Sequence, residues 1–248
     1  MVWSCLVSIL PGMAQTEKLT DYVNPFVGTD GYGNVYPGAQ IPFGGIQISP
    51  DTDSRFYDAA SGYKYNHLTL MGFSLTHLSG TGIPDLGDFL FIPGTGEMKL
   101  EPGTHEDPDQ GYRSRYSHDK EWASPNYYAV ELADYGVKAE MTSGVRSGMF
   151  RFTYPESDNA FIMIDMNHTL WQSCEWSNLR MINDSTITGY KLVKGWGPER
   201  HVYFTATFSK KLTGLRFVQD KKPVIYNTSR FRSSYEAVSY THLRAHET

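Results

Sequence analysis

Apolar and polar residues alternate with a period of two through much of the chain after residue 126, and this pattern constrains the fold more than any other feature of the sequence. Successive side chains of a β-strand point to opposite faces of the sheet, so an alternating stretch can bury one face and expose the other. The apolar stripes are Tyr128, Val130 and Leu132; Val137, Ala139 and Met141; Phe150, Phe152 and Tyr154; and Val202, Phe204, Ala206 and Phe208. The pattern predicts a strand at each stripe, with Thr205 and Thr207 of the last one facing solvent.

Short polar segments separate these stripes and contain Gly, Pro, Asn or Asp, which favour turns. They lie at residues 134–136, 143–144, 155–159 and 183–185. No segment has the apolar periodicity of an amphipathic helix of normal length. Short strands joined by such turns predict a mainly β chain, folded as an antiparallel β-sandwich, with long loops rich in Gly and Pro between residues 24 and 96.

The chain has 248 residues, of which 40% are hydrophobic and 20% are charged, enough apolar material for one large β domain with a core. A formal charge of −5 without a basic block argues against binding to nucleic acid. No apolar run approaches the roughly 18 residues of a candidate membrane span. The two cysteines, Cys5 and Cys174, are too few for a disulfide framework.

The two ends of the chain differ from its middle. Residues 1–14 resemble an export signal, because an apolar stretch ends in small residues, although no Lys or Arg precedes it; a buried strand is the alternative. Residues 238–248 break the alternation and look like a translated sequencing-adapter tail. We therefore predict a β-sandwich domain over residues 15–237 of an exported protein, which is periplasmic, on the cell surface or secreted. We expect the natural protein to continue beyond this domain.

A polar, glycine-rich segment at residues 76–82 is the first candidate for a functional site. His77, Ser79 and Thr81 lie beside glycines there, and two carboxylates follow shortly. Such a segment can form a binding rim, because glycine lets a ligand approach the backbone closely. It can equally be a hydrogen-bonded loop that caps the sandwich, and the residues leave both interpretations open. A zinc site is disfavoured, because no second His or Cys lies at ligand spacing.

A second candidate is the acidic segment Asp51–Arg55, which Asp58 follows. Clustered carboxylates can bind calcium, but this segment lacks the later Gly and Glu of an EF-hand loop. A solvent-exposed turn is the simpler interpretation. The glycine-rich residues 28–33 do not form a phosphate-binding loop, since the GxGxxG spacing and the helical pattern after it are both absent. No pair of carboxylates is recognisable as a catalytic acid and base.

A more specific signal comes from a series of motifs in a fixed order. The motifs are YVNPFVGT (22–29), YPGA (36–39), IPFG (41–44), QISPDT (47–52), SGYKY (61–65), GFSLTHLSGTG (72–82), SRYSH (114–118), LADYGV (132–137), GW (195–196) and HVYF (201–204). Over residues 21–210 this series resembles the opening of glycoside hydrolase family 92. The region after residue 212 is divergent.

The resemblance implies a calcium-dependent exo-α-mannosidase of the kind that bacteria export. In this family an N-terminal β-sandwich is joined to an (α/α)6 barrel, and the active site lies between them. The resemblance places the general acid, the general base and most calcium contacts in the helical domain, so we expect no catalytic and no metal-binding residue on this chain. It places loops of the sandwich near the sugar, and the implied substrate-binding residues are Asp51, Arg55, Tyr63, His77, Ser79, Gly80 and Thr81.

The implied reaction is hydrolysis of terminal α-mannosides with inversion, in which one carboxylic acid protonates the leaving oxygen and one carboxylate activates water. The expected partners are mannose-containing glycans and the helical domain of the same chain, with calcium on the sugar hydroxyls in the full-length enzyme. Two other hypotheses are a stand-alone carbohydrate-binding module and a structural scaffold. The module would stack sugars on tyrosines that could equally pack in the core, namely Tyr32, Tyr36, Tyr57 and Tyr63.

Overall fold

The computed structural model describes residues 17–54, 57–219, 222–223, 230–233 and 237–242. The signal-like segment 1–14 and the predicted site residue Arg55 lie outside these ranges. The strands are β1 (Ala39–Gln40), β2 (Gln47–Asp51), β3 (Thr69–Leu70), β4 (Gly72–Ser74), β5 (Leu90–Thr95), β6 (Ser114–Arg115), β7 (Glu121–Ser124), β8 (Tyr127–Leu132), β9 (Val137–Ser143), β10 (Gly148–Thr153), β11 (Ala160–Asp165), β12 (Ser173–Asn183), β13 (Thr186–Lys194), β14 (Arg200–Thr207), β15 (Thr213–Gln219), β16 (Lys222–Pro223), β17 (Arg230–Ser233) and β18 (Ala237–His242).

Helical structure in the described residues is limited to short 3-10 turns. They are η1 (Leu19–Tyr22), η2 (Tyr57–Ala59), η3 (Pro108–Gln110) and η4 (His118–Lys120). The prediction that the chain has no helix of normal length is therefore confirmed for this part of the chain. None of these helices has the length and apolarity that a bilayer crossing requires.

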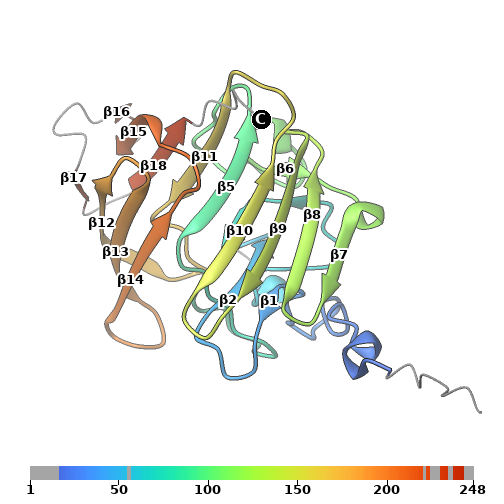
Figure 1. Ribbon diagram of the computed structural model, residues 1–248. Coiled ribbons are helices and arrows are strands. Elements are labelled where there is room, and N and C mark those ends of the chain that lie inside the picture. The colour runs from blue at the N-terminus through green and yellow to red at the C-terminus, as the bar shows by residue number, and fades with distance from the viewer. Residues whose placement is uncertain (1–16, 55–56, 220–221, 224–229, 234–236, 243–248) are drawn as a thin grey trace, which may run out of the picture.

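Two layers of antiparallel sheet form a β-sandwich, which confirms the predicted fold class (Figure 1). One layer is an eight-stranded sheet in the order β1-β2-β4-β5-β11-β18-β15-β16. The other layer consists of two four-stranded sheets, β10-β9-β8-β7 and β14-β13-β12-β17. In Figure 1 these two sheets lie to the right and to the left, and β5 and β11 of the long sheet run behind the space between β10 and β14. A small β3-β6 ladder completes the fold.

The predicted apolar stripes form the interior between the layers. The stripes of β8 and β9 are buried against Ile48 of β2 and Phe73 of β4. Phe91, Ile162 and Ile164 of the long sheet form a second cluster with Phe89, which directly precedes β5, and the half-buried side chains of β14 pack on it. Thr205 and Thr207 of β14 are exposed, as the alternation predicts. The predicted turns lie between β8 and β9, β9 and β10, β10 and β11, and β12 and β13.

The central strands β5 and β11 are buried on both faces, which the alternation did not predict. Their second face forms a third cluster, made of Leu90, Ile92, Phe161 and Met163. Half-buried apolar side chains from residues 98–100 and the buried Tyr112 pack on this face. A strand with apolar neighbours on both sides has no polar face to alternate, so its sequence is a continuous apolar run.

Long loops separate the strands β1 to β5 between residues 24 and 96, as predicted. The backbone of β18 pairs with β11 and with β15 in the long sheet. The predicted division into a signal-like segment, a domain over 15–237 and a non-native tail stays a prediction.

Gly38 lies where β1 approaches β2 so closely that no side chain fits. A Cβ atom at this position would be 2.0 Å from the carbonyl oxygen of Ile48 and 2.6 Å from the Cα atom of Ser49. Because these are backbone atoms, Gly38→Ala must displace a strand, and we expect the free energy of unfolding to fall by about 1–3 kcal/mol. Urea denaturation followed by circular dichroism measures the change.

The matched control is Gly82→Ala, because no atom lies within 4 Å of a Cβ built at Gly82. Its free energy of unfolding should stay within about 0.5 kcal/mol of the parent chain. Equal losses in the two variants would contradict the assignment of a close strand contact at Gly38.

Candidate functional site

A fully buried carboxylate at the end of β2, Asp51, joins two loops that are far apart in the sequence. Its Oδ1 lies 2.7 Å from Nε2 of His77, and its Oδ2 lies 2.7 Å from Nε2 of His168. His77 comes from the loop between β4 and β5, and His168 from the loop between β11 and β12. Both imidazoles are buried as well. The carboxylate therefore fastens both loops to the long sheet.

The contacts of His77 fix the orientation of its ring. Its Nδ1 lies 2.7 Å from the carbonyl oxygen of Gln47, while its Nε2 faces Asp51 and the hydroxyl of Ser74. Burial alone would raise the pKa of Asp51, but the charge and the hydrogen bonds of His77 and His168 outweigh it and hold that pKa well below its usual range. Asp51 is therefore an anion at neutral pH.

A second set of buried charges continues from the backbone of His168. Lys191 of β13 donates to the His168 carbonyl oxygen at 2.6 Å and forms a 3.1 Å ion pair with Oδ1 of Asp88, although Lys191 has no solvent exposure. Arg200 of β14 donates to Oδ2 of Asp88. Burial favours a raised pKa for Asp88, but the charges of Lys191 and Arg200 lower it overall. These bonds connect the sheet of β12–β14 to the same two loops.

Tyr63 belongs to a third buried polar group. Its hydroxyl donates to Glu121 of β7 at 3.0 Å, and the hydroxyl of Tyr128 donates to the same carboxylate. Nδ1 of His118 lies 2.6 Å from the other carboxylate oxygen. Burial first, and the nearby carboxylate after it, raise the pKa of Tyr63 far above its usual range. Tyr63 is thus a neutral donor that ties its loop to β7.

The predicted substrate-binding residues separate into a buried and an accessible group. The buried ones are Asp51, Tyr63 and His77, and the accessible ones are Ser79, Gly80 and Thr81. Both interpretations of the segment 76–82 therefore describe part of it, because its first half is a hydrogen-bonded cap and its tip is an open rim. Sugar contact stays a prediction for all six residues.

The acidic segment that begins at Asp51 is not the solvent-exposed turn that its composition predicted. Asp51, Thr52 and Asp53 have no solvent exposure. Each side chain has a partner: the hydroxyl of Thr52 accepts from the backbone N–H of Lys64 at 3.0 Å, and Oδ2 of Asp53 lies 3.2 Å from Nε2 of His105. The partners come from distant segments, and composition cannot reveal them.

The four tyrosines of the sugar-stacking hypothesis also fall into a buried pair and an exposed pair. Tyr36 and Tyr63 are buried in the first hydrophobic cluster, so core packing is the correct interpretation for them. Tyr32 and Tyr57 are exposed over 90% and 57% of their surface. Two of the four rings are therefore accessible to a ligand.

The described residues do not offer a calcium site. Nowhere among them do three His, Cys, Asp or Glu side chains gather in a way that could hold a metal ion. The buried carboxylates Asp51, Asp53 and Asp88 already bond to imidazole, ammonium or guanidinium groups.

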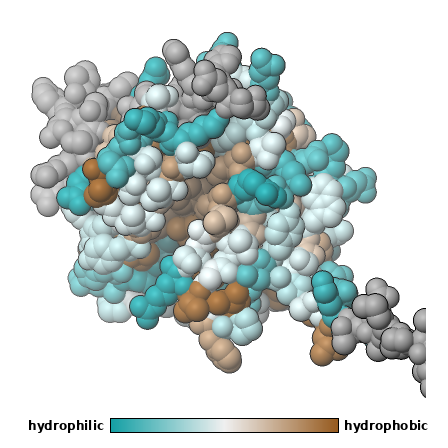
Figure 2. Space-filling model, viewed as in Figure 1, coloured by the Kyte–Doolittle hydropathy of each residue, from teal (hydrophilic) through white to brown (hydrophobic). Residues whose placement is uncertain are grey.

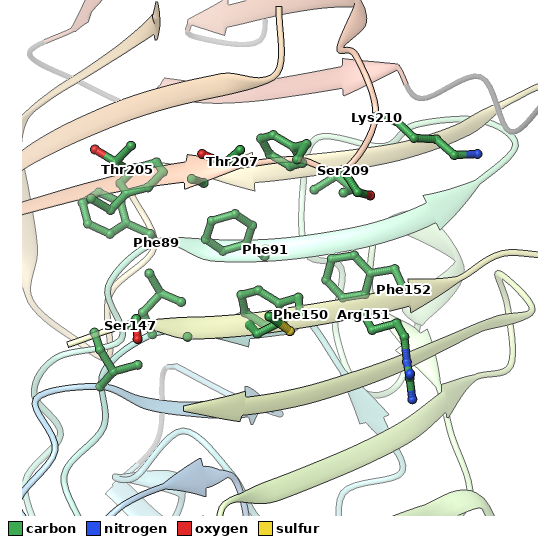
Figure 3. A pocket seen from close by; sticks show the side chains of 18 of the residues that line it. Phe89, Phe91, Ser147, Phe150, Arg151, Phe152, Thr205, Thr207, Ser209 and Lys210 are labelled. Carbon is green, nitrogen blue, oxygen red and sulfur yellow. The ribbon is translucent and has the colours of Figure 1, made fainter. Parts of the chain in front are cut away.

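A large cleft lies between β10 and β14 and has a volume of about 1350 Å³. Figure 2 shows apolar atoms recessed in this hollow, and Figure 3 shows the rings of Phe89, Phe91, Phe150 and Phe152 gathered in it. Among the described strands, β10 and β14 each end their sheet at the cleft. Such strand edges above an apolar floor favour association with other chain segments.

Sequence reasoning missed His168, Lys191 and Arg200. Their carboxylate partners are remote, since 117 residues separate Asp51 from His168 and 112 separate Asp88 from Arg200. One local signal was available, because Lys191 lies on the same face of its alternating strand as the buried residues of β13. A lysine on an apolar face indicates a buried, paired charge.

The fold and its loops define an antiparallel β-sandwich domain whose loop end is held by buried charges. The chain belongs to glycosyl hydrolase family 92, because the sequence model of the "Glycosyl hydrolase family 92 N-terminal domain" matches residues 22–246. This match confirms the resemblance that the ordered motifs carry.

Related proteins agree with this assignment. A family 92 α-mannosidase from Bacteroides thetaiotaomicron is 94% identical, with a TM-score of 0.87, over 92% of this chain and 32% of that one. The family 92 glycosyl hydrolase ccman5 is 26% identical, with a TM-score of 0.75, over 90% of this chain and 30% of that one. A secreted glycosidase of Arthroderma benhamiae is 30% identical over 139 residues, which are 55% of this chain and 17% of the relative. The chain thus spans a third or less of the length of these relatives.

We expect Asp51→Asn to lower the free energy of unfolding by about 3–5 kcal/mol, because it replaces the buried anion that His77 and His168 share with a neutral amide. Urea denaturation at pH 7 measures the loss. Asp119→Asn is the control, since Asp119 is exposed, and its effect should stay within about 0.5 kcal/mol. Similar effects of the two substitutions would rule out a structural role for the Asp51 anion.

The loss should also depend on pH with a defined sign. The pKa of Asp51 is lowered in the folded state, and an unfolded Asp has a pKa of about 3.9. Its contribution is therefore fully present above that pH and is lost as the pH falls below it. The stability difference between the parent chain and Asp51→Asn should shrink as the pH falls from about 5 to about 3, because the unfolded Asp takes up its proton in this range. A constant difference over this range would contradict the lowered pKa.

The apolar cleft predicts that the purified chain self-associates and binds an apolar dye. Val202 lines the cleft, so Val202→Lys should increase the monomer fraction and weaken dye fluorescence. Ile182→Lys is the control, because Ile182 is 51% exposed and lies on β12 outside the cleft. Light scattering after size-exclusion chromatography measures the mass, and a monomeric parent chain without dye binding would contradict the prediction.

Proposed function

We propose that this chain is the N-terminal β-sandwich of an exported α-mannosidase that removes terminal mannose from α-mannosides of glycans. The observation that carries the proposal is the 94% identity to a family 92 α-mannosidase over 92% of the chain. The same α-mannosidase forms a complex with mannoimidazole, which supports mannose as the sugar. The secreted glycosidase of Arthroderma benhamiae supports export.

We place the general acid and the general base in the part of the protein beyond this chain, which spans 32% of the length of the α-mannosidase. Inverting hydrolysis uses two carboxyl groups about 6.5–9.5 Å apart, with space for sugar and water between them. The buried carboxylates Asp51 and Asp88 do not suit these roles, because imidazole and cationic groups already occupy their oxygens. Their role in the proposal is to hold loops in place.

The contribution of this domain is a wall of the sugar pocket. The accessible tip at Ser79, Gly80 and Thr81 offers hydroxyl and backbone groups to sugar hydroxyls. His77, two residues before the tip, is fixed by Asp51 and by the backbone of β2. A wall fixed in this way orients the substrate at little entropic cost when it binds.

Calcium belongs to the proposal for the longer protein. When bound, the ion would supply positive charge that orients the sugar hydroxyls. Because the described carboxylates bond to other groups of this chain, the ligands would come from other residues. The remaining part of the same polypeptide is the proposed protein partner of this domain.

The proposal predicts that the purified 248-residue chain does not hydrolyse α-mannosides. A chimera that joins residues 15–237 to the remainder of the Bacteroides thetaiotaomicron α-mannosidase should release mannose from α-linked mannobioses. Proton NMR should show the β-anomer of mannose first, since the reaction inverts configuration. A chelator should abolish turnover, and added calcium should restore it.

The three parts of the proposal, namely the placement of the acid and base, the α-mannosidase function and the calcium requirement, have separate outcomes. Turnover by the 248-residue chain alone would overturn the placement of the acid and base elsewhere. A folded chimera without turnover, beside an active parent α-mannosidase prepared in the same way, would overturn the function proposed for this chain. Turnover that survives the chelator would overturn the calcium requirement alone.

A further inference from the structure

Two strand edges face each other across the apolar cleft. Among the described strands, β10 pairs only with β9, and β14 pairs only with β13. In the β9–β10 hairpin the backbone N–H of Gly144 donates to the carbonyl oxygen of Ser147, which fixes the phase of that ladder. Opposite residues of an antiparallel ladder alternate between bonded and non-bonded pairs. Arg151 therefore bonds to β9, while the N–H and C=O groups of Phe150 and Phe152 point into the cleft.

The edge of β14 has the same character. The backbone N–H of Phe208 donates to the carbonyl oxygen of Ser185 at 2.8 Å, and this bond fixes the phase of the β13–β14 ladder. Phe204 therefore bonds to β13, and the N–H and C=O groups of Tyr203 and Thr205 point away from β13 into the cleft. Two rows of backbone donors and acceptors thus face each other.

The two edges run in the same direction. Figure 3 shows the residue numbers increasing from left to right along β10, from Ser147 to Phe152, and along β14, from Thr205 to Thr207. The ladders on the other sides of both strands are antiparallel. One inserted strand that runs the opposite way would be antiparallel to both edges, whereas two antiparallel inserted strands would leave one parallel contact. The geometry therefore suits a single strand.

The floor of the cleft requires an apolar face on such a strand. The ring centroid of Phe91 lies 5.2 Å from that of Phe150 and 6.1 Å from that of Phe204, so Phe91 lies below the space between the two strands. Val202 and Ala206 also line the cleft, and both are only half-buried. A strand with alternating apolar residues would cover these side chains and keep its polar residues on the outer face.

The last described strand ends beside this cleft. His242 of β18 is in register with Phe161 of β11. The carbonyl oxygen of Phe161 accepts a hydrogen bond at 2.9 Å from the hydroxyl of Tyr154, which directly follows β10. The neighbouring Ala160 lines the cleft. β18 therefore ends at the same end of the cleft as β10, and a chain that turns there enters the cleft in the direction opposite to β10 and β14.

We propose that one strand from the segment directly after the sandwich in the longer protein inserts between β10 and β14. The strand is antiparallel to both edges and joins the two four-stranded sheets into one continuous sheet. The inference rests on the longer protein of the proposed function, of which this chain represents a third, since it spans 32% of the α-mannosidase. A tethered segment has an effective concentration that a second copy or a separate protein lacks.

The test is amide hydrogen exchange, measured at single residues by mass spectrometry. It compares the monomeric 248-residue chain with the chimera of residues 15–237 and the remainder of the Bacteroides thetaiotaomicron α-mannosidase. We expect the amides of Phe150, Phe152, Tyr203 and Thr205 to exchange at least about tenfold more slowly in the chimera, because the inserted strand accepts their hydrogen bonds.

The amides of Arg151 and Phe204 are the matched control, because their bonds to β9 and β13 protect them with or without the inserted strand. Within the chimera, the four edge amides should be about as protected as these two neighbours. Fast exchange of the edge amides beside protected control amides in the chimera would overturn the proposal.

A cross-link identifies the occupant. A photoreactive benzoylphenylalanine in place of Thr205 in the chimera should cross-link to the segment directly after the sandwich in the same polypeptide, which peptide mass spectrometry locates. The control position is Trp122, which is 44% exposed on β7 at the other edge of that sheet and should not give this cross-link. Cross-links between two chimera molecules would assign the cleft to a second copy, and cross-links to a remote segment would overturn the place assigned to the strand.

These outcomes are distinguishable from those of the proposed function. An active chimera with unprotected edge amides removes the inserted strand and keeps the α-mannosidase. An inactive, folded chimera with protected edge amides removes the activity and keeps the inserted strand.

Discussion

The loop end of this β-sandwich depends on one buried anion. Asp51 accepts hydrogen bonds from His77 and His168, which belong to two loops that adjoin the paired strands β5 and β11. A buried carboxylate is costly unless it is paired, and removal of a partner leaves an uncompensated charge. The loops are thus held by charge, and the positions of Lys191 and Asp88 extend the same arrangement toward β13. Apolar packing forms the sandwich, while ion pairs form its loop end.

Part of the backbone strain lies in the loops that this network holds. Leu86, Phe89 and Trp171 all have positive φ angles, and all three lie in the two loops that Asp51 fastens. Strained conformations persist when surrounding bonds over-determine them. The buried charges supply such bonds, since they hold each loop near its strained residue.

The sequence allowed the sandwich, its turns and most strands to be predicted, because period-two alternation and turn residues are local signals. It did not reveal that β5 and β11 are covered on both faces, nor that Asp51, Thr52 and Asp53 are buried. Burial of a polar residue depends on partners that folding brings from distant segments, as His168 illustrates. The ordered motifs identified the family and the loops, but they could not separate the side chains that brace a loop from those at its tip.

Two concave surfaces of the described residues differ in size and in the elements that form them. The cleft between β10 and β14 has an aromatic floor and strand edges, which suit another protein segment. The pocket at Trp171 and Trp196 combines rings with a lysine, a serine and a carboxylate close together. Polar and charged side chains also line the cleft, among them Arg151, Thr205 and Lys210, so hydrogen-bonding groups alone do not distinguish the two surfaces. The cleft differs from the pocket in its two strand edges, whose backbone groups can pair with another strand. The larger cleft is therefore better suited to a protein segment than to a small ligand.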